Sequence, residues 1–267
     1  MAATTSAGCE IHYDVTDERL PWFKDSPTIV FHHGVGACAD MWRGWTSALM
    51  ERYRLVRFDM RGHGRSSVAN GATTTIAALA ADLDAVVQAA CGDERIHLVG
   101  ESVGGTVVLA YALAHPRRVR TLTVSNGAHR GAPIGNLDDW AELMGQGGMA
   151  AWSDRMMQRR FHPGAISKQQ WLWYETQQAS ANGQVILDAV RALVAADLTP
   201  RLNELKLPVL LLHPDGSPFI PIPLMDELRA RLPDAQLRIF PHSKHGLPFS
   251  HADQCALQVA EFLGARS

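Results

Sequence analysis

Short apolar runs alternate along the chain with longer segments in which apolar residues recur at helical spacing. The short runs predict seven strands, at Cys9–Val15, Thr28–His32, Leu55–Asp59, Ile96–Gly100, Val119–Ser125, Pro208–His213 and Gln236–Phe240. The helical spacing predicts five helices, at Asp40–Glu51, Thr75–Ala90, Ser102–Ala114, Ile222–Arg231 and Ala252–Leu263. Because alternating strands and helices are typical of a parallel sheet flanked by helices, we expect an α/β fold.

This alternation stops in the middle of the chain. Residues 130–198 are rich in Trp, Met, Gln and Arg, and they predict several helices without strands. We therefore expect a single domain, with residues 1–129 and 199–267 forming the α/β core. Residues 130–198 would be a helical lid inserted after the strand Val119–Ser125.

Composition and charge narrow the classes of protein to consider. The 267 residues are 46% hydrophobic and 19% charged, which is typical of a globular domain, and the net charge of −2 disfavours nucleic acid and anionic membranes as partners. The four cysteines are widely spaced and predict reduced thiols. Without a signal-like start or a membrane-length apolar run, we expect a cytoplasmic protein. The sequence is compatible with a homo-oligomer.

The strongest chemical signal is Gly100-Glu101-Ser102-Val103-Gly104-Gly105, directly after a predicted strand and before a predicted helix. Strand, serine and helix in this order are the context of a nucleophile elbow, in which a sharp turn exposes the serine hydroxyl. Glycines beside the serine leave room for that turn. Ser102 is therefore the candidate nucleophile, and the Val103 N–H is placed to bind an oxyanion.

A general base is expected late in the chain, after the last predicted strand. The segment Pro241-His242-Ser243-Lys244-His245-Gly246 offers two histidines. We favour His245 over His242 because His245 lies further out in the loop before the final helix. An imidazole there can accept the Ser102 proton.

These motifs, with His33-Gly34 and Asp59-Met60-Arg61-Gly62-His63-Gly64-Arg65-Ser66, resemble the α/β-hydrolase superfamily over nearly the whole chain. The resemblance implies a mostly parallel sheet flanked by helices, with a helical lid after the sixth strand. It also implies that the Val35 N–H, after Gly34, completes an oxyanion hole with Val103. Neither a metal nor another cofactor is implied.

The middle third looks most like 3-oxoadipate enol-lactonases. The likeness lies in Val119–Ala128, Ile134-Gly135, Trp140, Gly147–Ala150, Arg160-Phe161 and Asp197-Leu198. The chain departs from that family at Leu143, where the family tends to carry arginine, and at Ser217, where the family's catalytic acid would lie.

The third member of the catalytic group therefore stays open among three residues. Asp215 would take the acid role if its loop were shifted by two residues, and we favour it because it alone carries charge. Asn126, directly after the strand Val119–Ser125, could instead orient His245 through its amide, as Asn does in Cys-His-Asn sites. As a third alternative, Ser102 and His245 would act without a strong orienting group, with Ser217 at the acid's position.

The lid offers candidate substrate contacts. Drawn as a helix, Met149–Phe161 places Trp152 and Arg159 on one face, with Arg155 one turn earlier. A shared anionic ligand would explain two neighbouring arginines, although both could equally extend over apolar surface. His129, at the lid entrance, gives weak further support for a carboxylate-bearing substrate.

The expected activity is that of a serine esterase, lactonase or activated-amide hydrolase. Its substrate would be a small, carboxylate-bearing metabolite, cleaved through an acyl-enzyme on Ser102. The alternative is a non-catalytic or weakly catalytic small-molecule-binding protein on the same fold. Ser217 in place of an acid favours that alternative, whereas Ser102, His245 and Gly34 favour the enzyme.

Overall fold

The computed structural model describes residues 1–23, 25–131 and 137–265. Its strands form one sheet of eight, in the order β1-β2-β4-β3-β5-β6-β7-β8. The strands are β1 Ala2–Ser6, β2 Cys9–Thr16, β3 Thr28–His32, β4 Arg54–Phe58, β5 Ile96–Glu101, β6 Val119–Ser125, β7 Val209–Pro214 and β8 Ala235–Phe240. The pairs β1–β2 and β2–β4 are antiparallel, and all other pairs are parallel.

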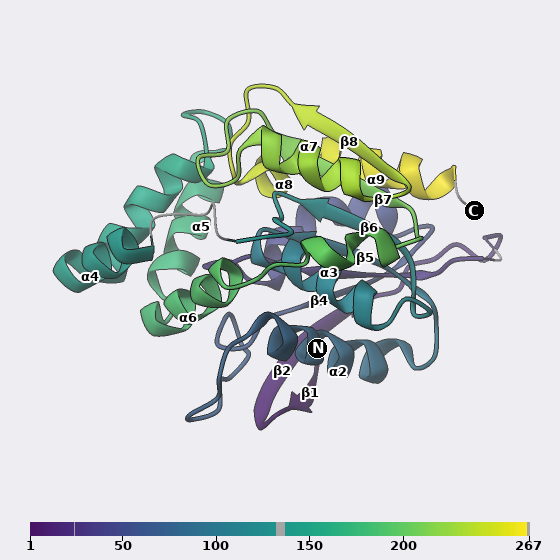
Figure 1. Cartoon of the computed structure of the whole chain (residues 1–267), viewed down its shortest axis with the longest axis horizontal. Helices are drawn as coiled ribbons and strands as arrows, with labels where there is room; N and C mark the ends of the chain where they lie inside the picture. The colour runs from purple at the N-terminus through teal and green to yellow at the C-terminus, as the bar shows by residue number, and fades with distance from the viewer. Residues whose placement is uncertain (24, 132–136, 266–267) are drawn as a thin grey trace.

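Helices cover both faces of this sheet (Figure 1). They are η1 Ala39–Trp45, α1 Thr46–Leu49, α2 Ile76–Cys91, α3 Val103–Ala114, α4 Leu137–Arg160, α5 Lys168–Ala179, α6 Gly183–Val194, η2 Thr199–Glu204, α7 Ile222–Arg231, α8 Leu247–Ser250 and α9 Ala252–Gly264. One apolar core includes residues of α2, α3 and α7, and a second includes residues of η1, α1 and α9. The predicted arrangement, a mostly parallel sheet flanked by helices with further helices after Val119–Ser125, is therefore observed.

The predicted elements agree closely with those observed. Thr75 ends the loop before α2, and its hydroxyl accepts the Ala78 N–H, as expected for a helix N-cap. The predicted helix Asp40–Glu51 is two shorter elements, η1 and α1. Strand β1 and helix α8 were not predicted. Both are short, and β1 is an exposed edge strand whose sequence is not strongly apolar.

The segment after β6 contains α4, α5 and α6, which lie together beyond one end of the sheet (Figure 1). Helix α4 is interrupted at Gly148, where φ is 67°, so that its second half begins at Met149. Ile134 and Gly135 lie outside the described residues. Among the described helices, none is long and apolar enough to cross a membrane.

Candidate active site

Ser102 lies at the sharp turn between β5 and α3. Its φ of 56° and ψ of −122° place a non-glycine residue in left-handed backbone, a conformation that costs about 1–3 kcal/mol and is concentrated at functional sites. A Cβ at Gly104 would lie 2.5 Å from the His32 carbonyl oxygen, so only glycine allows this close approach. The turn therefore has the geometry of a nucleophile elbow.

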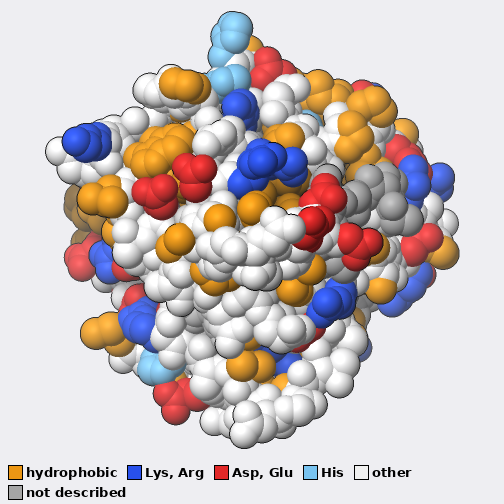
Figure 2. Space-filling model, turned by 90° about the vertical axis from the view of Figure 1, so that its left-hand side faces the viewer, with side chains coloured by type: hydrophobic (Ala, Val, Ile, Leu, Met, Phe, Trp, Pro, Cys, Tyr) orange, Lys and Arg blue, Asp and Glu red, His pale blue; other side chains and the backbone are white. Residues whose placement is uncertain are grey.

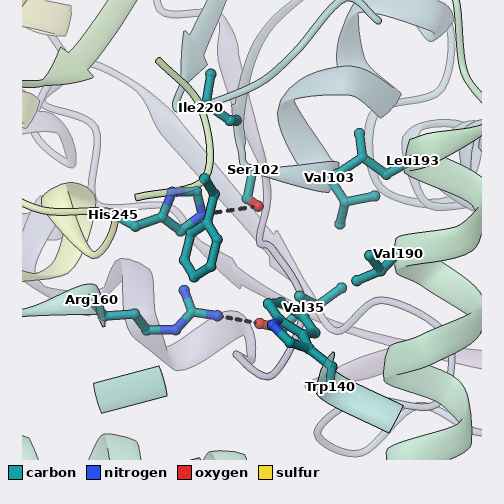
Figure 3. A pocket seen from close by; sticks show the side chains of 10 residues that line it. Val35, Ser102, Val103, Trp140, Arg160, Val190, Leu193, Ile220 and His245 are labelled. Carbon is teal, nitrogen blue, oxygen red and sulfur yellow. Dashed lines mark hydrogen bonds between the residues drawn. The ribbon is translucent and has the colours of Figure 1, made fainter. Parts of the chain in front are cut away.

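His245 lies in the loop after β8, and its ring faces Ser102 (Figure 3). The Ser102 Oγ is 3.1 Å from His245 Nε2, within hydrogen-bonding distance. Both side chains are buried, and burial, with further contributions from Arg160 and His213, holds the His245 pKa well below its usual value. The imidazole is therefore neutral at pH 7 and free to accept a proton. His242 is exposed and donates its backbone N–H to Asp215.

The other ring nitrogen of His245 faces Ser217. The Ser217 Oγ lies 3.3 Å from His245 Nδ1 and also accepts the Ile220 N–H at 3.2 Å. If Nδ1 carries the proton and donates it to Ser217, the Nε2 lone pair faces Ser102, as a general base requires. A hydroxyl fixes this tautomer, but it brings no negative charge to the imidazolium that forms during catalysis.

Asp215, the favoured candidate for the acid, is held elsewhere. Its carboxylate accepts the backbone N–H groups of His242 and Ser243, at 2.9 and 3.1 Å, and so stabilises the loop that carries His245. Asn126 contacts the base through the backbone only, because its Nδ2 donates to the His245 carbonyl oxygen at 2.7 Å. Of the three candidates, the structure brings Ser217 to Nδ1. The charge of Asp215 is visible in the sequence, whereas its hydrogen bonds across the loop are not.

The two candidate oxyanion donors, Val35 and Val103, line one cavity with Ser102 (Figure 3). The Met60 N–H donates to His33 Nε2, which leaves the proton on Nδ1, and Nδ1 lies 2.7 Å from the Gly34 carbonyl oxygen. That carbonyl belongs to the same peptide group as the Val35 N–H. His33 therefore orients and polarises the peptide that would bind the oxyanion.

Sequence reasoning missed a buried ion pair beside Ser102. The Glu101 Oε1 lies 3.8 Å from Arg160 Nη1 and 3.7 Å from His245 Nε2. A Cβ at Gly34 would lie 2.1 Å from Glu101 Oε2, so glycine is also needed there. Arg160 further donates to the Val35 carbonyl oxygen and to Gln178 Oε1. The available signal was an acidic residue at the end of a mostly apolar strand, where a buried charge requires a partner.

Burial of Glu101 predicts a specific dependence of stability on pH. Burial raises the pKa of Glu101 from 4.5 to about 7, against an opposing effect of Arg160. The folded state then holds this proton more tightly than the unfolded chain. The stabilisation from this group is complete below pH 4.5 and is lost as the pH rises to 7, a change of about 3 kcal/mol.

We therefore expect Glu101→Gln to remove this part of the pH dependence. Urea unfolding of wild type and variant at pH 5 and pH 8 would measure it. Between pH 5 and pH 8, the unfolding free energy of wild type should fall by about 3 kcal/mol more than that of the variant. The exposed Glu51→Gln is the matched control and should show no such shift. Equal shifts for both variants would contradict the expectation.

The cavity at Ser102 is small and mostly apolar. Its volume is about 30 Å³, room for only one or two water molecules, and the lining residues are Val35, Ser102, Val103, Trp140, Arg160, Val190, Leu193, Phe219, Ile220 and His245. A metabolite needs more space, so side chains of the lining must move to admit one.

Trp152, Arg155 and Arg159 of α4, which were expected to bind substrate, lie outside this cavity. Trp152 is fully buried and packs edge-on against Trp140. Arg155 and Arg159 line a neighbouring hollow, which shares Trp140 with the Ser102 cavity. Asp139 and Glu142 line that hollow too, and Figure 2 shows acidic and basic side chains interspersed on this side of the molecule.

His129 does not face Ser102 either. It is buried against α7, with Nε2 3.5 Å from Glu227 Oε1, and Arg130 binds the same carboxylate. Among the described residues, no cluster of three His, Cys, Asp or Glu side chains could hold a metal ion.

Comparison with known proteins identifies the family. The family model for the alpha/beta hydrolase fold matches residues 27–252, and the chain belongs to this family. The chain is 30% identical over 256 residues to "Putative carbamate hydrolase RutD" of Caulobacter sp. strain K31, covering 91% of this chain and 93% of that protein. It is 31% identical over 204 residues to 3-oxoadipate enol-lactonase 1 of Acinetobacter baylyi, covering 74% of each.

A solved enol-lactonase from Burkholderia xenovorans LB400 superimposes with a TM-score of 0.88 and 25% identity, covering 98% of this chain and 100% of that structure. The expected resemblance to enol-lactonases is thereby confirmed, as is the prediction of a hydrolase.

Proposed function

We propose that the chain is a serine hydrolase that cleaves an ester, lactone or activated amide of a small metabolite through an acyl-enzyme on Ser102. The observation that carries the proposal is the 3.1 Å contact between Ser102 Oγ and His245 Nε2 at a strained elbow. Relatives named as an enol-lactonase and a carbamate hydrolase support it, because both names denote acyl transfer to water.

The reaction follows from these positions. His245 Nε2 takes the Ser102 proton while Oγ bonds to the substrate carbonyl carbon, whose π electrons move to the oxygen. The N–H groups of Val35 and Val103 are the candidate donors to that oxyanion. His245 then gives its proton to the leaving group as the bond to carbon breaks. Water, deprotonated by His245, next adds to the acyl carbon. As the bond between that carbon and Ser102 Oγ breaks, His245 returns the proton to Oγ, which releases the acid and the free serine.

The apolar lining suits the uncharged acyl part of the substrate. Arg160 is engaged by Val35, Gln178 and Glu101, so a substrate carboxylate is better placed at the distal end. There, Arg159 and Arg155 line the hollow beyond Trp140, and Arg159 lies over Phe219, which lines the Ser102 cavity.

A pair of esters tests the substrate class. We expect a p-nitrophenyl ester with a terminal carboxylate to be cleaved with about tenfold higher kcat/KM than its methyl-terminated analogue. Arg159→Gln should remove this preference without changing the rate on the methyl-terminated ester. Arg191→Gln, on the surface of α6, is the matched control. If Arg159→Gln leaves the preference intact, the carboxylate site is wrong; if neither ester is cleaved, the binding-protein alternative is favoured.

A further inference from the structure

Among the described residues, the strand that carries the nucleophile also brings an acidic side chain to within 3.7 Å of the catalytic base. We propose that Glu101 is a positioning residue for His245 and takes over the electrostatic role of the missing triad acid, acting from the opposite side of the imidazole. This inference rests on the proposed function. It assigns the acid role to a residue directly preceding Ser102 in the chain.

The geometry supports this assignment. The Glu101 Oε1 lies 3.7 Å from His245 Nε2, the nitrogen that receives the serine proton. The Glu101 side chain is fully buried, and neither of its oxygens is hydrogen-bonded to a described side chain. Its second charged neighbour, Arg160, is slightly further away, at 3.8 Å. The carboxylate is therefore shared between a permanent cation and a ring that becomes cationic during the reaction.

The need for such a charge follows from the surroundings of His245. When the ring accepts the Ser102 proton, a positive charge forms in a buried space that already contains Arg160. Its Nδ1 faces the neutral Ser217 hydroxyl. Without a counter-charge, burial would strongly disfavour the imidazolium. A carboxylate at 3.7 Å opposes that cost without occupying the acid's usual position.

Other titratable or charged groups near His245 and Glu101 come from several elements. They are Arg160 of α4, Tyr174 of α5, His213 of β7 and His33 after β3. Arg160 and His213 both disfavour protonation of His245, and burial keeps His33 and His213 neutral at pH 7, with pKa values of about 4. Unlike these groups, an ionised Glu101 carries a negative charge that stabilises the imidazolium.

The experiment moves the negative charge from one side of the ring to the other. In the wild-type background, Glu101→Gln should lower kcat/KM for p-nitrophenyl acetate at pH 8 about 100-fold. In a Ser217→Asp background, where a carboxylate faces Nδ1, the same substitution should cost less than about threefold. Ser217→Asn has nearly the same shape without the charge, so the loss should persist in that background.

A second readout is the pH–rate profile. Because burial raises the pKa of Glu101 to about 7, the carboxylate gains its charge between pH 6 and pH 8, so wild-type kcat/KM should rise about tenfold over this range and Glu101→Gln should show no such rise. A merely structural defect would lower the rate at every pH and leave the rise in place. If the glutamine variant does not fold, Glu101→Asp should give an intermediate loss of kcat/KM. Its shorter side chain keeps the negative charge but holds it further from the imidazole.

The outcomes distinguish the role of Glu101 from the proposed function. A rise between pH 6 and pH 8 that persists in Glu101→Gln, or an equal loss in all three backgrounds, would overturn the role of Glu101 even if Ser102 is the nucleophile. A chain that cleaves no ester in any of the three backgrounds would overturn the proposed function and, with it, the role of Glu101.

Discussion

Replacing Ser102 with alanine is expected to lower kcat for p-nitrophenyl acetate by a factor on the order of 10⁶, down to the background of the folded protein. The Ser102 hydroxyl is the group that His245 Nε2 faces, at 3.1 Å. Alanine removes the attacking oxygen and leaves the elbow backbone in place. The measurement is steady-state release of p-nitrophenol, corrected for the spontaneous rate.

A buried serine at the end of the neighbouring strand provides the control. Ser125, the last residue of β6, is fully buried, and its Oγ has no hydrogen-bond partner among the described residues. Ser125→Ala should therefore keep nearly all activity. If Ser102→Ala hydrolyses the ester as fast as wild type, Ser102 is not the nucleophile and the binding-protein alternative becomes the better account.

Replacing Ser217 with aspartate is expected to raise kcat/KM about 100-fold. Its carboxylate would accept the His245 Nδ1 proton and the backbone N–H groups of Phe219 and Ile220, which now point at the Ser217 Oγ. In a serine protease, changing the acid to an amide costs about 10⁴ in rate. We expect a smaller gain here because Glu101 already supplies part of the charge.

Ser217→Asn is the matched control for this gain, because its amide can orient the imidazole but cannot stabilise the imidazolium by full charge. We expect it to stay within about threefold of wild type. The gain is measured as kcat/KM on the same ester at pH 8. An aspartate variant that raises the His245 pKa but not the rate would show that charge at Nδ1 does not limit this reaction.

The fold could be predicted from the sequence because its signals are local. Apolar runs and helical spacing depend on neighbouring residues, and they located strands such as Val119–Ser125 and helices such as Ile222–Arg231 at their observed bounds. Strand β1 was not predicted because an edge strand pairs with only one neighbouring strand and does not require strongly apolar residues. Ser102 and His245 were predictable for a related reason, since each lies in a recognisable loop at the carboxyl end of a strand.

The remaining site residues depend on contacts between distant segments. Asp215 and Ser217 are two positions apart, and only the path of the loop decides which meets Nδ1. The pairing of Glu101 with Arg160 joins β5 to the end of helix α4. No local pattern contains that information. Asp215 was favoured for its charge, whereas the charge near the base belongs to a residue adjacent to the nucleophile.

The covalent intermediate is the most direct test of the central claim. Wild-type protein mixed with p-nitrophenyl acetate, quenched in acid within the first turnovers and digested, can be examined by mass spectrometry. The account predicts one acetyl group on the peptide that contains Ser102, absent from Ser102→Ala. Ester hydrolysis at the full wild-type rate with Ser102 unmodified at every quench time, or with the acetyl group on another residue, would contradict it.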